Sequence, residues 1–436
     1  GKMKKQSLLT LVLIPVFVFL LLAYISPAFS ASDQPVVIGF IGSFDSDAGK
    51  STLRGAEIAI EEINAAGGML GGRMIKLVKA DTAQDVTEGI KAYEYLNEKE
   101  KVDFIISGCV DDVSLGWLPR MVEYKTPTLD TWTSSYLAIE KVRNEYEKYK
   151  MYFMNVPNDW ALGTQYVDFG KDVLAKELGY KTTVIMQEDT AYAAGVYGLV
   201  EAILPEAGIK MLDHIVYDVN TVDFSPIYNK IIKTKPDFIY IISSVKCVVP
   251  TSQYVKMQVP IPITGINVAA VGREFWKDTG GMGGGMSTFM PPPTIGMDMD
   301  PRTEKFVKKY QAKYKKRPVY PHFNGFNAYY GIYNAVSAAE RAGGFKPLDA
   351  WVKEMENEDI KLYKDGKLWL RYAYWKPGEI EPRTELAWPH NIKFDITPPF
   401  DEGIPSVIVI QWNTDGTVKC VYPPKYANGK FAVPSW

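Results

Sequence analysis

The sequence predicts an α/β protein of two domains, each built on a parallel sheet with helices on both faces. Short apolar runs typical of buried strands alternate with amphipathic stretches typical of helices over most of residues 35–259. The alternation comes in two series, separated near residues 151–158. The length of 436 residues and the apolar content of 47% are sufficient for two cores.

The first series starts with a β-branched run at residues 35–41, which is typical of a buried parallel strand. A helix follows at 52–66, where apolar residues recur at helical spacing and two glycines supply the stop. The expected strands and helices then alternate at 74–80, 85–98, 102–107, 112–124 and 128–130.

The second series repeats this pattern. It comprises helices and strands at 159–178, 182–187, 191–207, 211–216, 224–232, 238–242 and 251–259. Residues 151–158 and 286–290 are expected to cross between the domains and so to form a hinge. Residues 301–356 are expected to be helical, and a hairpin is expected at 406–422 around Asn413-Thr414-Asp415-Gly416.

The N-terminus has the pattern of a secretory signal. Two lysines precede an apolar stretch from residue 8 to 25, and small residues precede a cut after Ser30. The apolar stretch also approaches the length needed to span a bilayer. We therefore expect residues 1–32 to be either a cleaved signal or an N-terminal anchor, and the remaining chain to be exported to the periplasm or the cell surface.

Composition argues against several functions. A formal net charge of −2 gives no electrostatic basis for nucleic-acid binding. Three cysteines and three histidines are too few and too scattered for a disulfide framework or a metal site. No motif of a serine hydrolase or zinc peptidase is present. We expect no enzyme activity, no cofactor and no metal.

Several strings in a fixed order resemble the branched-chain amino-acid (Leu/Ile/Val-binding) type of periplasmic substrate-binding proteins of ABC transporters. They are IGFIG at 38–42, RGAEIA at 54–59, EINAAGG at 62–68, GGR at 71–73, KTP at 125–127, DFS at 223–225, the segment 325–344 and VIQW at 409–412. Together they extend over nearly the whole chain after the N-terminal segment.

The resemblance implies a type I periplasmic-binding fold, in which two Rossmann-like lobes joined by a three-strand hinge close on a small ligand. On this basis we expect lobe 1 at residues 33–155 and 291–375, and lobe 2 at 156–290 and 376–436. The partners implied are a small amino-acid-like ligand and the permease and ATPase subunits of an importer, and we expect a monomer. A membrane-tethered ligand sensor of the same fold is the alternative.

In open α/β sheets, ligands bind beyond the carboxyl ends of the strands. In lobe 1 this places Ser43 and Asp45 after the first strand, and Val110 and Asp111 after the third. The resemblance implies a serine that holds the ligand carboxylate at the position of Val110, so that hydroxyl is missing here. Asp111 is expected either to cap the following helix or to face the ligand.

After the fourth strand, the resemblance places Thr131 and Thr133 where backbone groups and a threonine hold an amino acid; helix capping is the alternative. In lobe 2, Tyr192 corresponds to the tyrosine that closes over the ligand, and its ring and hydroxyl suit that role. Lys246 ends another strand and is expected either to pair with an anionic ligand or to be solvated at the surface.

The resemblance also implies an acidic partner for the ligand ammonium, but Asn267 stands at that position. An asparagine accepts a hydrogen bond and does not neutralise a cation, so Asp111 or Asp45 would have to take this role. These departures make an aromatic acid, an amide or another small polar organic molecule an alternative ligand.

Overall fold

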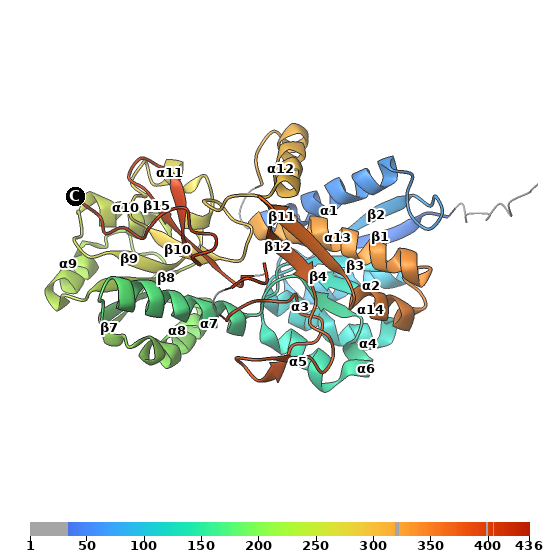
Figure 1. Ribbon diagram of the computed structural model, residues 1–436, viewed down its shortest axis with the longest axis horizontal. Coiled ribbons are helices and arrows are strands. Elements are labelled where there is room, and N and C mark those ends of the chain that lie inside the picture. The colour runs from blue at the N-terminus through green and yellow to red at the C-terminus, as the bar shows by residue number, and fades with distance from the viewer. Residues whose placement is uncertain (1–33, 319–321, 398–399, 404) are drawn as a thin grey trace, which may run out of the picture.

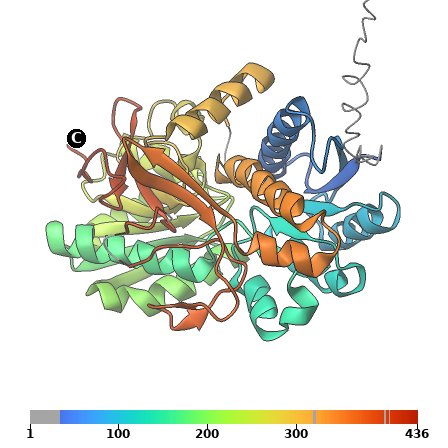
Figure 2. The ribbon, with the colours of Figure 1, turned by 45° about the vertical axis from the view of Figure 1, so that its right-hand side comes forward.

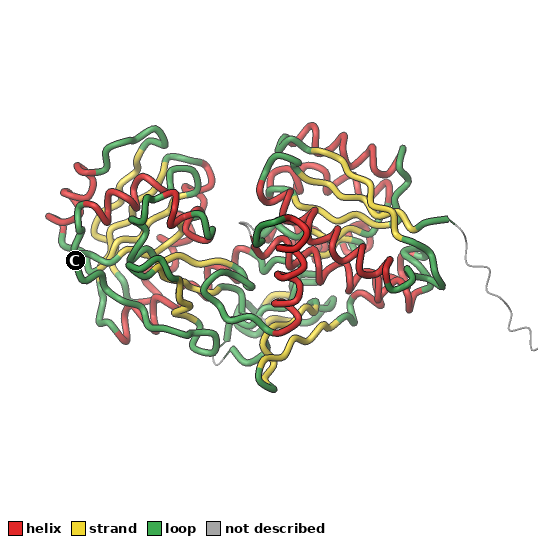
Figure 3. Tube along the Cα trace, turned by 90° about the horizontal axis from the view of Figure 1, so that it is seen from above, coloured by secondary structure: helices red, strands yellow, loops and turns green. Residues whose placement is uncertain are grey.

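The protein is described by a computed structural model covering residues 34–318, 322–397, 400–403 and 405–436. The predicted signal or anchor at 1–32 lies outside these residues. Two α/β lobes lie side by side (Figure 1), and the view from above shows them joined by a narrow waist (Figure 3). The predicted fold class is confirmed.

Lobe 1 is built on a parallel sheet of five strands in the order β2-β1-β3-β4-β5. The strands are β1 (Val36–Gly42), β2 (Ile75–Asp81), β3 (Phe104–Gly108), β4 (Thr128–Asp130) and β5 (Tyr152–Met154). The predicted run at 35–41 thus forms a strand with a neighbour on each side. Its near-continuous burial explains why the run is apolar instead of alternating.

Helices cover both faces of this sheet. They are α1 (Asp47–Ala65), α2 (Val86–Glu98), α3 (Asp111–Trp117), η2 (Leu118–Arg120), α4 (Met121–Tyr124), α5 (Tyr136–Asn144), α6 (Tyr146–Tyr149), α12 (Pro301–Tyr314), α13 (His322–Ala342) and α14 (Leu348–Met355). Helices α1 and α13 lie side by side (Figure 2). A Cβ atom on Gly55 would lie 2.1 Å from the carbonyl oxygen of Gly325, so glycine permits this close approach.

Lobe 2 repeats the arrangement with a parallel sheet in the order β7-β6-β8-β9. The strands are β6 (Thr182–Glu188), β7 (Lys210–Tyr217), β8 (Phe238–Ser243) and β9 (Ile263–Asn267). Its helices are α7 (Asp159–Phe169) with its π-helical continuation η3 (Gly170–Glu177), α8 (Ala191–Ile203), η4 (Leu204–Ala207), α9 (Ser225–Thr234), α10 (Val248–Lys256), η5 (Ala269–Val271) and α11 (Phe275–Asp278).

Three antiparallel strands complete this side of the molecule. They are β10 (Ser287–Met290), β15 (Ile408–Trp412) and β16 (Val418–Tyr422), and β15 lies between the other two. The predicted terminal hairpin is therefore confirmed. The remaining strands form two separate hairpins that the sequence analysis did not predict: β11 (Asp359–Lys364) with β12 (Lys367–Ala373), and β13 (Ile380–Glu381) with β14 (Leu386–Ala387).

The two predicted crossing strands need correction. The first part of residues 151–158 is β5, the edge strand of the lobe 1 sheet, and only the residues after Met154 lead to lobe 2. Residues 287–290 are β10, which pairs with β15. The chain passes between the lobes after β5, after β10 and again between β14 and β15, and isolated bridges such as Met154–Asn391 connect these segments.

The predicted lobe boundaries stay a prediction. Trp388, Phe394 and Ile396, which the sequence analysis placed in lobe 2, pack in a core cluster with Ile41 and Trp117 of lobe 1. Within the described ranges, no helix combines the length and the apolar character that crossing a membrane requires.

Candidate functional site in the cleft between the lobes

A cavity of about 690 Å³ lies between the two lobes at the carboxyl ends of their strands. Its lining residues come from both lobes and from the connecting segments. They are Val110, Asp111, Asp112, Trp132, Ser134, Val156, Leu162, Tyr192, Ser244, Ile266, Asn267, Val268, Val271, Thr288, Phe289, Met290 and Pro291. The volume lies within the range of small-molecule binding sites.

The floor of the cleft is apolar and aromatic. Trp132 of lobe 1 packs against a cluster formed by Val156 of the first crossing and by Val271 and Met290 on the lobe 2 side. The Phe289 ring is held in place by Tyr166, with 4.2 Å between the ring centroids. An apolar floor of this kind excludes water from a bound ligand.

Asp111 lies at the first turn of α3 and lines the cleft. Its Oδ1 accepts hydrogen bonds from the backbone N–H groups of Ser134, at 2.9 Å, and Ser135, at 3.2 Å. Burial raises the pKa of Asp111, and these two donors lower it only in part. Val110 precedes the helix and provides no capping side chain.

Two further carboxylates bind the neighbouring amides of the same loop. Asp130 Oδ1 accepts from Trp132 and Thr133, at 3.1 and 3.0 Å, and Asp159 Oδ1 accepts from Tyr136 at 3.1 Å. Burial raises the pKa of Asp159 to about 6. Every backbone N–H from residue 132 to 136 therefore already donates to a carboxylate of the protein.

Thr131 and Thr133 are buried and do not line the cleft. The Thr131 hydroxyl donates to the carbonyl oxygen of Ser107 at 2.8 Å, and the Thr133 hydroxyl donates to that of Cys109 at 3.4 Å. Both side chains hold the strand ends together. Their predicted contact with a ligand stays a prediction.

Ser43 and Asp45 also lie away from the cleft lining. The Ser43 hydroxyl accepts from the backbone N–H of Ser46 at 3.2 Å, which stabilises the turn that enters α1. The Asp45 side chain is exposed, and its carbonyl oxygen accepts a hydrogen bond from Lys50. The role of Asp45 as an ammonium partner stays a prediction.

On the lobe 2 side, Tyr192 lies at the start of α8 and faces the cavity with 51% of its surface exposed. Thr190 caps this helix by accepting from the Ala193 N–H at 3.1 Å. The cap fixes the first turn and therefore the position of the Tyr192 ring. This position suits a group that packs onto a ligand when the lobes close.

Glu188, at the end of β6, is fully buried behind Ser244. Its carboxylate accepts from the backbone N–H groups of Ser244, Val245 and Lys246 at 2.7–3.1 Å, and from the Ser244 hydroxyl. Burial alone would raise the pKa of Glu188, but these hydrogen bonds lower it. Lys246 contributes a backbone amide here and does not line the cavity, so its pairing with an anionic ligand stays a prediction.

Asn267 lines the cavity, but the structure uses both ends of its amide internally. Its Nδ2 donates to the Thr251 hydroxyl at 2.9 Å, and its Oδ1 accepts from the Ala270 N–H at 3.1 Å. Four predicted residues thus come together at the cleft: Val110, Asp111, Tyr192 and Asn267.

Sequence analysis missed several groups that shape the site. Trp132 and Phe289 are large aromatics beside a predicted strand end and within a predicted crossing, and both positions could have drawn attention to them. Glu188 and Asp159 were not predicted because their hydrogen-bond partners are distant in sequence. Only the strand-end position of Glu188 gave a usable signal.

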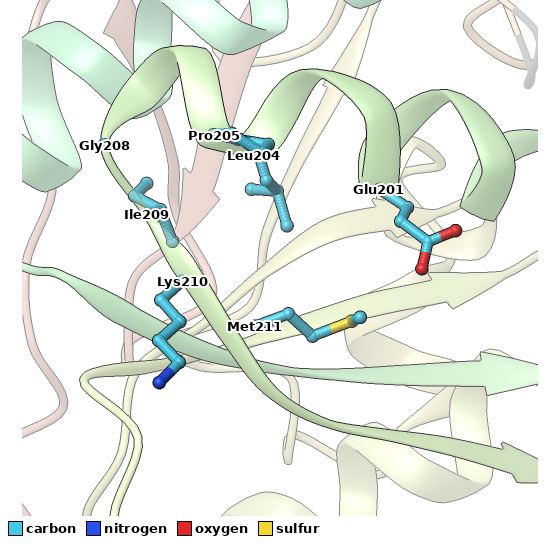
Figure 4. A pocket seen from close by; sticks show the side chains of 7 residues that line it. All are labelled: Glu201, Leu204, Pro205, Gly208, Ile209, Lys210 and Met211. Carbon is cyan, nitrogen blue, oxygen red and sulfur yellow. The ribbon is translucent and has the colours of Figure 1, made fainter.

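Among the described residues, no other pocket, metal-binding group or reactive cysteine resembles a functional site as closely as the cleft does. A hollow beside α8 and the start of β7 is lined by one acid, one lysine and mainly apolar side chains (Figure 4), and it lies away from the carboxyl ends of the strands. In the part of the chain that the structure describes, no group of three or more His, Cys, Asp or Glu side chains is arranged to hold a metal ion. All three cysteines are free and buried.

The sequence model of the periplasmic binding protein family matches residues 35–367. The chain belongs to the periplasmic binding protein family. Its members are binding proteins, so the chain is a binding protein and not an enzyme, and the predicted recognition is confirmed. No curated protein matches the sequence.

Solved structures share the fold of this periplasmic binding protein at low sequence identity. A protein from Silicibacter pomeroyi described as a branched-chain amino acid ABC transporter is 18% identical, with a TM-score of 0.73 over 92% of this chain and 100% of the other. A branched-chain amino acid transporter substrate-binding protein from Streptococcus pneumoniae, solved with isoleucine, is 16% identical (TM-score 0.65; 89% and 100% covered). A solute-binding protein from R. palustris, solved with benzoate, is 15% identical (TM-score 0.67; 89% and 95% covered).

Proposed function

We propose that this protein is the extracytoplasmic solute receptor of an ABC importer. It binds a small amino-acid-like molecule between its lobes, closes by hinge motion and presents the ligand to a permease with its ATPase subunits. The observation that carries the proposal is the cavity of about 690 Å³ at the strand ends of both lobes, beside the three chain crossings. The structural neighbours from Silicibacter pomeroyi and Streptococcus pneumoniae, both described as branched-chain amino acid transporter proteins, support the same role.

An amine-bearing ligand fits the lobe 1 wall, where Asp111 and Asp112 line the cavity. An aromatic acid is the alternative supported by the benzoate-bound neighbour and by Trp132 and Phe289 in the floor. The membrane-tethered sensor remains the second alternative. Identifying the N-terminal residue of the protein isolated from its native membranes and periplasm tests it, since tethering requires residues 1–32 to be retained.

A thermal-shift screen of the purified protein tests receptor function. The panel comprises amino acids, amines, aromatic carboxylates, amides and sugars, and a ligand at 100 times its Kd is expected to add about 2.7 kcal/mol to the free energy of unfolding. Mass spectrometry of the recovered ligand is expected to show no chemical change. Stabilisation by no panel member, or turnover of one, would contradict the proposal.

Closure of the lobes can be followed by tryptophan fluorescence, because Trp132 lines the cleft. Binding is expected to change the tryptophan emission of the protein, and Trp132→Phe is expected to remove most of that change. Trp160→Phe is the matched control, since Trp160 is 42% exposed and does not line the cavity.

A further inference from the structure

We infer that the cleft is built for a small organic cation without a carboxylate, namely an amine or quaternary ammonium group on an apolar or aromatic body. The inference rests on the proposed receptor function and narrows the amino-acid-like ligand of the same site to one that keeps the amine and lacks the carboxylate. Three properties of the cleft support it: the amides of the turns at residues 132–136 and 244–246 are already used, carboxylate oxygens of Asp111 and Asp112 are free, and aromatic rings line the same cavity.

The first property concerns the donors that could hold a ligand carboxylate. In lobe 1, the N–H groups of residues 132–136 all donate to Asp111, Asp130 or Asp159. In lobe 2, the N–H groups of residues 244–246 all donate to Glu188. An anionic ligand held by either of these two turns would have to displace a protein carboxylate from hydrogen bonds that each contribute about 1.5–3 kcal/mol.

The second property is the charge that the wall presents. Among the described residues, Asp111 Oδ2 accepts no hydrogen bond, and the Asp112 carboxylate has no hydrogen-bond or ion-pair partner. The cavity lining contains both of these acids and no Lys, Arg or His. A bound ammonium group would therefore meet acceptors that the folded protein leaves free, while a bound carboxylate would meet like charge.

The third property is the shape of the apolar part. Trp132, Phe289 and Tyr192 line the same cavity as the two acids. Aromatic faces attract ammonium groups, and the attraction is about 0.5–2 kcal/mol depending on desolvation. Tyr192 faces this wall from the other lobe, so closure would bring a ring over a ligand seated at Asp111 and Asp112.

The matched test uses ligand series that differ only in charge. One series is phenethylamine, phenylalanine and 3-phenylpropionate, and the other is isoamylamine, leucine and 4-methylpentanoate. Calorimetric titration of the purified protein is expected to show that in at least one series the amine binds at least 10-fold more tightly than the amino acid. The free acid is expected not to bind at millimolar concentration.

Variants of the two acids test whether the preference for amines comes from the lobe 1 side of the cavity. Asp112→Asn is expected to weaken binding of that amine about 10-fold, and Asp111→Asn by a similar factor, because an asparagine Oδ1 still accepts from Ser134 and Ser135 and so keeps the loop. Asp278→Asn is the control, since this exposed acid of α11 lies outside the cavity lining and leaves binding unchanged. Equal loss in all three variants would overturn the assignment.

The two proposals fail in different ways. If the amino acids or the free acids bind at least as tightly as the amines, the cation inference is overturned and receptor function stands. Absence of amine binding in both series also overturns the inference. Receptor function itself fails only if the broad panel gives no ligand or shows turnover.

Discussion

In each wall of the cleft a carboxylate accepts hydrogen bonds from backbone amides of a turn, but the two carboxylates differ in exposure to the cavity and in pKa. In lobe 1, Asp111 binds backbone amides and keeps one oxygen at the cavity, whereas in lobe 2 Glu188 binds its amides from a fully buried position. Burial raises the pKa of Asp111, while the pKa of Glu188 is lowered despite its burial. Donors and neighbouring charges both contribute to the difference. Asp111 has two amide donors and the like charges of Asp130 and Asp112 beside it, whereas Glu188 has three amides and the Ser244 hydroxyl.

The comparison indicates a division of labour. In lobe 2, the Glu188 carboxylate has a structural role. It occupies the anion-binding position of the turn at residues 244–246 by accepting hydrogen bonds from its three amides. In lobe 1, the Oδ2 atom of Asp111 and the Asp112 carboxylate have no donor among the described residues and remain available to a ligand. The predictions below test this contrast, from the largest expected effect to the smallest.

Replacing Glu188 by leucine should cause the largest loss. It would remove the shared acceptor of the partly buried N–H groups of Ser244, Val245 and Lys246, at a cost of roughly 4 kcal/mol in the free energy of unfolding. Urea unfolding at pH 7 measures it. Glu188→Gln keeps one carbonyl acceptor and should lose less, and a loss below about 1 kcal/mol for Glu188→Leu would show that these amides find other partners.

Replacing Trp132 by alanine should lower the free energy of unfolding by about 2 kcal/mol, because the ring covers the cluster of Val156, Val271 and Met290. It should also weaken ligand binding at least 10-fold. Trp160→Ala provides the comparison, and its 42% exposed side chain predicts a change within about 0.5 kcal/mol. Similar losses in both variants would mean that Trp132 is not part of a packed floor.

Asp159→Asn should raise the free energy of unfolding at pH 7 by about 1–2 kcal/mol. The folded-state pKa, raised by burial to about 6, lies above the unfolded value of about 3.9. Between these values the folded state holds a proton that the unfolded state has lost, so stability falls as the pH rises from about 4 to about 6 and then stays at its lower level. The asparagine removes this penalty and keeps an acceptor for Tyr136.

The gain should therefore be largely lost at pH 4, where the folded carboxyl of Asp159 is protonated and about half of the unfolded chains also hold the proton. Urea unfolding of the unmodified protein and of Asp159→Asn, each at pH 4 and pH 7, measures how the gain in the free energy of unfolding changes with pH. A gain that is the same at both pH values would show that the asparagine acts through packing instead of charge.

Tyr192→Phe should have the smallest effect. The Tyr192 hydroxyl makes no hydrogen bond to any described residue, and the ring is half exposed, so the free energy of unfolding should change by less than about 0.5 kcal/mol. Amine affinity should change less than threefold, while Tyr192→Ala should lower it about 10-fold. Titration of both variants distinguishes a ring contact from a hydroxyl contact.

Much of the fold could be predicted because local periodicity reports burial directly. The strand at 128–130 was predicted with the observed bounds. Residues 152–154 were misread because a strand within a sheet and a strand that crosses a hinge have the same apolar pattern, and only distant pairing with β4 distinguishes them. The β11–β12 hairpin was missed although Asp365-Gly366 is a turn signal.

Fewer of the site residues could be predicted from the sequence. Strand ends drew attention to Asp111 and Tyr192, which line the cleft. Nothing local shows that Asp159 binds an amide 23 residues away, or that Glu188 binds amides 56–58 residues away. Because these carboxylates use up the donors, the polarity of the cleft depends on tertiary contacts and not on the residue types at the strand ends.

The late return of the chain to each lobe also constrains how the protein is made. Helix α1 packs on α13, which lies more than 250 residues further along the chain, and β10 pairs with β15 near the C-terminus. A growing chain therefore holds two incomplete cores with exposed apolar surface until almost all of it has been synthesised. We expect such a chain to need chaperones before it folds, and truncations near the C-terminus should lead to aggregation and not to a shorter folded protein.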